Sequence, residues 1–170
     1  IMKKNFLFIP FLISNLIFSQ EEKKLFQEYE DVERIFNKYL LEVDKKDIRK
    51  MHHYFNDRCT MVFGSRTPKV MKTREEFINI FTAWKNSSKA KFFKTRIDKI
   101  QVLPVWDDPE TSLCTVDATY SRLNENGEVI SRGRTLYHFT RYKYFLGIDK
   151  IIKKFKRWKI YMMTDLDIES

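Results

Sequence analysis

TSLCTVDATYSRL, residues 111–123, alternates between side chains that favour a protein interior and side chains that favour water. In an extended chain, Cys114, Val116, Ala118 and Tyr120 lie on one face and the polar residues between them on the other. A period of two is typical of a β-strand with one buried face. Residues 111–123 therefore predict a strand whose apolar face packs against a core.

A tight turn follows this strand. Residues 124–127 read Asn-Glu-Asn-Gly, and the Asn-Gly pair is a strong signal for a short β-hairpin. We therefore expect residues 129–142 to return antiparallel to the first strand. Residues 91–103 and 157–168 also have strand-forming composition, which predicts a meander of four long antiparallel strands.

The region before the meander is helical in pattern. Apolar residues recur at steps of three and four over residues 21–43, and Asp44 is placed to cap a second helix over 45–55. A capping box at Thr73–Glu76 predicts a third helix, and 59–72 predicts a short hairpin between these helices. Helices followed by an antiparallel sheet indicate the α+β class.

The first residues have the pattern of a secretion signal. Lys3 and Lys4 precede the apolar run 6–18, and charged residues follow Ser19. The apolar run is shorter than the about 20 residues of a membrane-spanning helix. We expect a signal peptide over residues 1–19 and an exported domain over 20–170, periplasmic or extracellular. The alternative is an N-terminal membrane anchor.

The chain is basic, with a formal net charge of +9. The densest basic stretch is residues 143–159, where seven Lys and Arg accompany Asp149 and alternate with apolar side chains. Such a stretch can contact anionic surfaces weakly, or it can be a hairpin with one solvated face. Because we expect export, we predict no nucleic-acid partner.

The residues that most often bind metals or carry nucleophilic chemistry show no known spacing. His52 and His53 are adjacent on the expected helix, so they point about 100° apart and do not chelate one ion. Cys59 and Cys114 lie in apolar stretches, where cysteine behaves as a small buried hydrophobe, although neighbouring strands would allow them to pair. We predict no metal site and no cofactor.

Four motifs resemble one known family. FNDRCTMVF at residues 55–63, the capped helix at Thr73, GRTLYHF at 133–139 and RWKIY at 157–161 are similar in type and order to the nuclear-transport-factor-2-like superfamily, in particular its SnoaL-like branch. The resemblance covers residues 30–168. It implies a cone-shaped domain in which N-terminal helices pack on a curved antiparallel sheet around a pocket. It also implies a homodimer through the outer face of the sheet.

The resemblance does not select a function, because the family contains isomerases, dehydratases, cyclases, hydrolases and non-catalytic binding domains. Its ketosteroid isomerases use a carboxylate near the end of the first strand. The matching stretch here is Met61-Val62-Phe63-Gly64 and carries no acid. The tyrosine that the family places on its first helix corresponds to Tyr39.

Candidates for proton-transfer chemistry are Asp117, His138 and Asp165 on the expected sheet and Tyr39 on the first helix. If the turn is centred between Glu125 and Asn126, Asp117 lies opposite Arg134 and His138 opposite Leu113. Asp117 is then better explained as one half of a cross-strand ion pair.

On the last strand, strict alternation places Asp165 on one face with Tyr161 and Met163, and Ile160 and Met162 on the other. Either face can line the pocket. The candidates for ligand contact are the aromatic and apolar residues expected to face it: Tyr39, Tyr54, Met61, Phe63, Phe81, Trp84 and Tyr120.

Two functions follow from these residues. The first is an exported domain that binds a small apolar or aromatic ligand without chemistry. The second is a small enzyme that performs proton transfer, dehydration or cyclisation on an apolar substrate in the same pocket. The orientation of Asp165 and His138 separates them, because a catalytic group must face the pocket beside a tyrosine.

Overall fold

The computed structural model of the protein describes residues 30–63, 67–107, 111–142 and 157–166. Contacts divide the chain into residues 1–31 and a second unit, Val32–Ser170, to which every described strand belongs. The expected signal peptide over 1–19 lies outside the described residues, as does most of the basic stretch 143–159.

Six strands form one sheet in the order β2-β1-β6-β5-β4-β3. Their bounds are β1 Phe55–Phe63, β2 Lys69–Met71, β3 Lys94–Asp107, β4 Thr111–Leu123, β5 Val129–Tyr142 and β6 Lys159–Leu166. The predicted antiparallel meander is confirmed as β3-β4-β5-β6. β1 adds a parallel pair with β6 and an antiparallel pair with β2, so the sheet is mixed.

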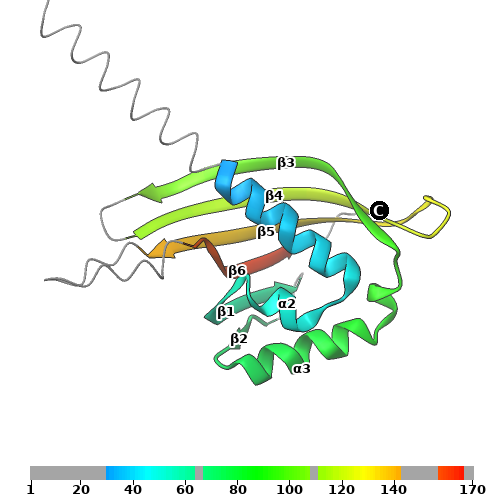
Figure 1. Ribbon diagram of the computed structural model, residues 1–170, viewed down its shortest axis with the longest axis horizontal. Helices are drawn as coiled ribbons and strands as arrows, with labels where there is room; N and C mark the ends of the chain where they lie inside the picture. Colours follow the sequence, from blue (N-terminus) through cyan, green and yellow to red (C-terminus); the bar gives the residue numbers. More distant parts are fainter. Residues whose placement is uncertain (1–29, 64–66, 108–110, 143–156, 167–170) are drawn as a thin grey trace, which may run out of the picture. The chain divides into compact units, whose positions relative to one another are not determined.

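The helices lie on one face of this sheet (Figure 1). Residues 30–45 are helical, followed by α2 (Ile48–His52), α3 (Arg74–Lys85) and the short 3₁₀ helix η1 (Ser88–Ala90). Val32, Phe36 and Tyr39 are buried at helical spacing. The rings of Phe36 and Tyr39 both contact Tyr137 of β5, at 4.9 and 5.8 Å between centroids. This packing confirms the α+β class, and the interior between helices and sheet is aromatic.

The first helix ends later than the sequence predicts. Lys46 has a φ of 53°, in the left-handed region, and its N–H bonds to Val43 while that of Asp47 bonds to Glu42. This hydrogen-bond pair is a C-terminal helix cap that glycine usually provides. The predicted cap at Asp44 is wrong because Asp47 accepts from the Lys50 N–H and begins α2.

The predicted capping box of α3 is confirmed in its main contact. The Thr73 hydroxyl accepts from the Glu76 N–H at 3.2 Å. The Glu76 carboxylate accepts from the Lys72 N–H instead of that of Thr73. α3 therefore begins where the sequence predicts, but the Glu76 carboxylate bonds to the N–H of the residue before Thr73.

The register of β4 and β5 differs from the predicted one by two residues. Asp117 lies opposite Leu136, and His138 lies opposite Thr115 rather than Leu113. The predicted ion pair nevertheless forms on the diagonal, because Arg134 is long enough to reach Asp117.

Strict alternation on the last strand is also wrong. Phe139 pairs with Ile160 and His138 with Met162, so Tyr161 is an extra residue in a β-bulge. The bulge places buried Ile160 on the same face as Met163 and Asp165. The ring of Tyr161 lies 6.1 Å from His138 on the opposite face.

Cys59 and Cys114 are buried free thiols, as expected from their apolar stretches. Burial raises the pKa of each thiol to about 12. Both are therefore protonated core residues at neutral pH. Within the described ranges, no helix is long and apolar enough to span a bilayer.

Candidate functional site

The inner face of the sheet, which packs against the helices, brings a carboxylate together with hydroxyl groups from two neighbouring strands. Asp165 of β6 lies opposite Thr135 of β5, and the Thr135 hydroxyl donates to its Oδ1 atom. Thr135 is 1% exposed, so the hydroxyl group that donates this hydrogen bond is buried. The contact ties Asp165 to the centre of the sheet.

Tyr120 of β4 extends this group across a third strand. The centroid of its ring lies 5.4 Å from the Cζ atom of Arg122. Asp165 acts electrostatically on the Tyr120 phenol, so the group extends from β6 and β5 to β4.

Gly133 makes room for the ring of Tyr120. The two residues are opposite each other in the β4–β5 ladder. A Cβ atom at Gly133 would lie 2.5 Å from the Cζ atom of Tyr120, closer than real Cβ contacts come. The ring can lie across β5 and reach Thr135 because position 133 has no side chain.

The surroundings of Asp165 are aromatic. Burial, followed by the negative charge of Asp165, raises the pKa of Tyr120. Burial is the main cause of the raised pKa of Tyr39 and Tyr137, and Asp165 contributes to both. All three phenols are therefore neutral at physiological pH and can donate hydrogen bonds beside a carboxylate.

The second carboxylate oxygen of Asp165, Oδ2, is not the one that accepts from Thr135. Among the described residues, no partner is found for Oδ2, and no Lys or Arg forms an ion pair with this carboxylate. Asp165 is also partly exposed, unlike Thr135. The arrangement can accept a proton or a hydrogen bond from a molecule that reaches Oδ2.

Two other catalytic candidates lie on the outer face of the sheet. Arg134 donates to both carboxylate oxygens of Asp117, at 2.9 and 2.6 Å, and lowers the pKa of Asp117. The Nδ1 atom of His138 is 2.9 Å from the Thr115 hydroxyl, and burial lowers the pKa of His138. The structure therefore separates both residues from Asp165, while it keeps Tyr39 beside it.

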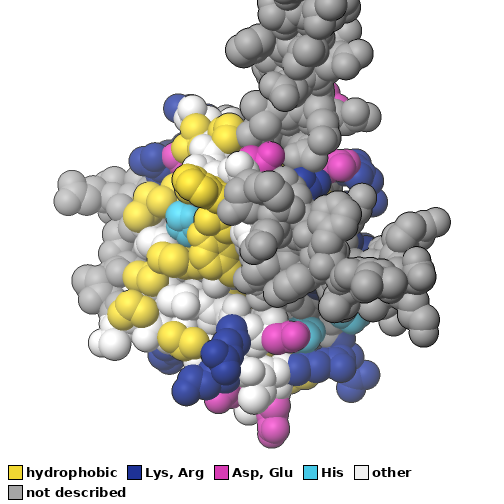
Figure 2. Space-filling view, turned by 90° about the vertical axis from the view of Figure 1, so that its left-hand side faces the viewer, with side chains coloured by type: hydrophobic (Ala, Val, Ile, Leu, Met, Phe, Trp, Pro, Cys, Tyr) yellow, Lys and Arg dark blue, Asp and Glu magenta, His cyan; other side chains and the backbone are white. Residues whose placement is uncertain are grey.

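The outer face is apolar around His138. Leu103 is 37% exposed, and Leu113, Leu136 and Met162 are partly exposed on the same face. Figure 2 shows hydrophobic side chains gathered around a histidine on one side of the molecule. This surface is distinct from the aromatic interior.

The predicted ligand-contact residues fall into two groups. Tyr39, Tyr120 and Phe63 lie near Asp165, since Phe63 is its partner on β1. Met61 is fully buried two pairs further along, and Tyr54 contacts the ring of Tyr39 at 5.8 Å. Phe81 and Trp84 lie on α3, where Phe81 stacks on Phe77 at 4.2 Å, and Phe55 connects this cluster to Tyr39.

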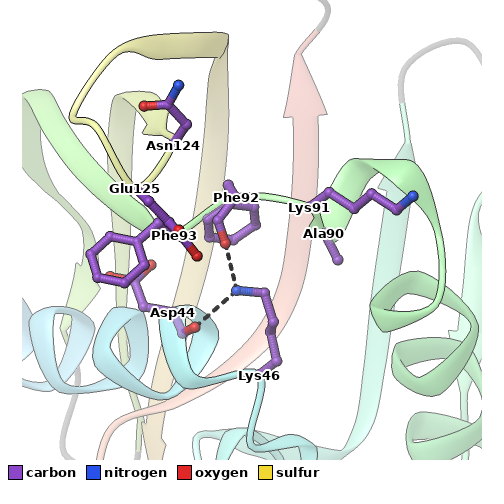
Figure 3. Close-up of a pocket in the computed structure, with 8 residues that line it drawn as sticks. All are labelled: Asp44, Lys46, Ala90, Lys91, Phe92, Phe93, Asn124 and Glu125. Atoms are coloured by element: carbon purple, nitrogen blue, oxygen red, sulfur yellow. Dashed lines mark hydrogen bonds between the residues drawn. The ribbon is translucent and has the colours of Figure 1, made fainter.

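A hollow of about 510 Å³ lies at another place, between the end of the first helix, the segment before β3 and the β4–β5 turn. Figure 3 shows the Lys46 ammonium in it, donating to the backbone oxygens of Asp44 and Phe92 at 3.0 and 2.7 Å. The Asp44 carboxylate accepts from the Thr95 N–H at 3.0 Å. These contacts fasten the helix end to the start of β3, so they have a structural function.

Metal-ligating residues do not gather on the part of the chain that is described. No group of three or more His, Cys, Asp or Glu side chains is placed to hold an ion there. His52 packs its ring on Phe77 at 5.2 Å and not on an ion-binding partner.

Sequence reasoning missed Thr135 and Gly133. A correct β4–β5 register would have placed Thr135 opposite Ala118, on the buried face of the predicted alternation. An isolated glycine within a strand is a further signal, because it often marks a close approach by another group. Both signals are present in the sequence, but neither identifies the approaching group.

Comparisons with known proteins agree on the fold. The family model described as NTF2-like protein (DUF6841) matches residues 27–144. No curated protein matches the sequence. An NTF2-like protein with a cystatin-like fold from Novosphingobium aromaticivorans is 10% identical, with 86% of each chain covered and a TM-score of 0.52.

Two further solved structures are similar. ActVI-ORFA from Streptomyces coelicolor is 8% identical, with 82% of this chain and 96% of that chain covered and a TM-score of 0.57. A ketosteroid isomerase-like protein from Erwinia carotovora atroseptica is 14% identical, with 84% and 98% covered and a TM-score of 0.50. At such identities the similarity concerns the fold alone.

Proposed function

The chain belongs to the NTF2-like family DUF6841, and from this membership we propose that it binds a small apolar or aromatic ligand on the inner face of its sheet. We also propose that the chain belongs to the SnoaL-like branch, because of the motifs at residues 55–63 and 133–139. We further propose that it is exported, because residues 1–19 have the pattern of a secretion signal.

The observation that carries this proposal is the orientation of Asp165. Its carboxylate lies on the inner face, with Oδ1 bonded to Thr135 and three buried tyrosines in its electrostatic surroundings. Small-molecule sites commonly combine apolar and aromatic walls with a few polar groups that fix the orientation of the ligand. Asp165 and Tyr120 supply those groups here.

A second candidate is catalysis of proton transfer, dehydration or cyclisation at the same place. The observation that favours it is the presence of a carboxylate beside neutral phenols. The carboxylate can act as a general base, and the phenols can donate hydrogen bonds. Asp165 would take a proton from the substrate, and Tyr39 would donate to the oxygen on which negative charge develops. His138 has no part in this scheme because it lies on the outer face.

Native mass spectrometry of the purified chain tests the binding proposal. We expect a co-purified mass that is released on denaturation and is lost in Asp165→Asn. The matched control is Asp117→Asn, which changes the same chemical group on the outer face and should keep the ligand. Retention of the mass by Asp165→Asn, or its absence from the unaltered chain over a range of expression hosts, would contradict the proposal.

Deuterium exchange separates binding from catalysis. The ligand is released from the protein and then added back to it in heavy water. A protein that performs proton transfer incorporates solvent deuterium into this ligand. We expect incorporation to stop in Asp165→Asn if the second candidate is right. A ligand that returns without deuterium shows that the chain binds it without proton transfer.

The outer face suggests a homodimer. We propose that a second copy of the chain packs against the apolar residues around His138 on this face. The resemblance to the family implies the same surface. Leu136→Lys, placed on this face, should convert a dimer into monomer in the same native spectra. A monomeric unaltered chain would contradict this proposal and would leave the ligand proposal standing.

A further inference from the structure

His138 lies within the apolar surface on the outer face of the sheet. Its partners in the ladders are Thr115 of β4 and Met162 of β6, and Leu136 precedes it on the same face of β5. Leu103 of β3 lies beyond Thr115 in the same row. Leu136 and Met162 are partly exposed, and Leu103 is 37% exposed. A second copy that packs on this surface therefore covers the imidazole.

Thr115 supplies a polar contact to this imidazole. The Nδ1 atom of His138 lies 2.9 Å from the Thr115 hydroxyl, and the ring centroid of Tyr161 is 6.1 Å from that of the imidazole. A hydroxyl group can bond to either tautomer, but it brings no charge that would compensate an imidazolium. Burial lowers the pKa of His138. The single chain therefore already favours the neutral imidazole.

The charged groups on the strands that pair with β5 are bonded elsewhere. Asp117 of β4 and Arg134 of β5 form a bidentate ion pair with each other, at 2.9 and 2.6 Å. The ammonium of Lys159, on β6, donates to the carbonyl oxygen of His53. These contacts direct the three charged groups away from His138.

The next strands outward carry charges that act on other groups. Lys99 of β3 and Arg58 of β1 are exposed cations. Asp57 of β1 acts electrostatically on His52 and on Lys159. Over the described ranges, no charged group contributes to the lowered pKa of His138. A proton on His138 is therefore not compensated by a neighbouring carboxylate.

A symmetric dimer brings the same face of a second copy against this surface. In each copy, Asp117 is bonded to Arg134, and Asp98 accepts from Arg96 at 2.8 Å. These carboxylates are thus neutralised within their own chain, and the second copy adds apolar surface around His138. Removing an uncompensated charge from water is unfavourable, so an imidazolium opposes the packing of the two copies, whereas a neutral imidazole does not.

We propose that protonation of His138 separates the two copies, so that the dimer forms at neutral pH and dissociates in mild acid. This inference rests on the proposed homodimer and specifies its regulation. By linkage, a proton that favours the single chain binds more weakly to the dimer, so the pKa of His138 falls further when the copies associate. Each copy carries one His138, so a fall of about one pKa unit per copy changes the dissociation constant about a hundredfold.

Sedimentation equilibrium of the unaltered full chain at about pH 7.5 and about pH 5 measures this effect, because the imidazole titrates between these values. We expect the dissociation constant of the dimer to be about tenfold to a hundredfold higher in acid. A dimer of the same strength at both pH values contradicts the inference and leaves the dimer standing. A chain that is monomeric at both contradicts the dimer and the inference together.

A pair of variants assigns the effect to its residue. His138→Gln stays neutral at both pH values and keeps a group that can bond to Thr115, so its dissociation constant should change by less than about twofold. His53→Gln removes an exposed histidine just after α2 and should keep the full effect. An effect that survives in His138→Gln, or that disappears in His53→Gln, overturns the assignment.

Histidine NMR of the unaltered chain gives a second measurement that does not depend on the folding of a variant. The imidazole Hε1 resonance of His138 is titrated with acid in a dilute and in a concentrated sample. We expect its pKa to be lower by about half a unit or more in the concentrated sample, where the dimer prevails. The Hε1 resonance of His53 should titrate in the same way in both samples. Equal pKa values of His138 at the two concentrations, in samples that differ in their fraction of dimer, would contradict the inference.

Discussion

Asp165 and Asp117 lie on the same sheet and face opposite ways. Asp117, on the outer face, is held by a bidentate Arg134 and has its pKa lowered by that contact. Asp165, on the inner face, is held at one oxygen by Thr135 and is surrounded by tyrosines. The difference teaches that both oxygens of the outer carboxylate are bonded within the chain, whereas for the inner one a partner is found at only one oxygen among the described residues.

The largest effect is expected from Gly133→Ala, which tests the packing on the inner face of the sheet, where Asp165 lies. The new methyl group would meet the ring of Tyr120 at 2.5 Å. We expect a loss of about 1–3 kcal/mol in the free energy of unfolding, measured by urea denaturation, because the ring must move.

Tyr120→Leu is the control for that substitution. Once the ring is absent, adding Gly133→Ala should cost much less than it does in the unaltered chain, and a double-mutant cycle measures the difference. If the cost of Gly133→Ala is the same with and without the Tyr120 ring, the close approach of these residues is not its cause.

Thr135→Val sharpens the comparison by removing the donor to Asp165. The carboxylate oxygen is then left without its hydrogen bond, and we expect a loss of about 1–2 kcal/mol in unfolding free energy. Thr119→Val is the matched change on the outer face, and it should stay within about 0.5 kcal/mol of the unaltered chain. Equal effects of the two substitutions would show that Thr135 does not hold Asp165.

Asp117→Asn has a smaller expected effect. The folded state lowers the pKa of Asp117, so the ion pair stabilises the protein above the unfolded pKa, and this contribution is lost as the pH falls through the folded pKa. The pair is at the surface, so we expect at most about 1 kcal/mol, and less in high salt. Thermal unfolding of the variant should depend less on pH in the acidic range than that of the unaltered chain.

The smallest effect is expected at His138. Burial lowers the pKa of the folded imidazole, so the unfolded chain binds a proton more readily and stability falls as the pH drops below about 7. His138→Gln should flatten this part of the stability profile, whereas His53→Gln, at an exposed histidine, serves as the control. A profile that His138→Gln leaves unchanged would contradict the assignment.

Much of the fold was predictable because its signals are local. The alternation of residues 111–123 and the Asn-Gly turn predict the β4–β5 hairpin, and Thr73 predicts the start of α3. Each signal depends on neighbours in the sequence. These signals also predict which face of β4 is buried.

The remaining details depend on contacts between distant residues. Lys46 ends the first helix in a conformation that glycine usually adopts, where its ammonium reaches the carbonyl of Phe92. The bulge at Tyr161 reverses the alternation on β6, and it arises from pairing with β5. A sequence pattern gives neither contact, so it predicted Asp165 as a candidate without its partner Thr135.

The most direct test of the account is an NMR measurement of the two carboxyl groups. The side-chain carboxyl carbons of Asp165 and Asp117 are followed while phenethyl alcohol, a small aromatic probe, is added to the full chain. The account predicts that the Asp165 resonance shifts to saturation and that the Asp117 resonance does not move. Binding that moves Asp117, or that leaves Asp165 unchanged, would contradict it.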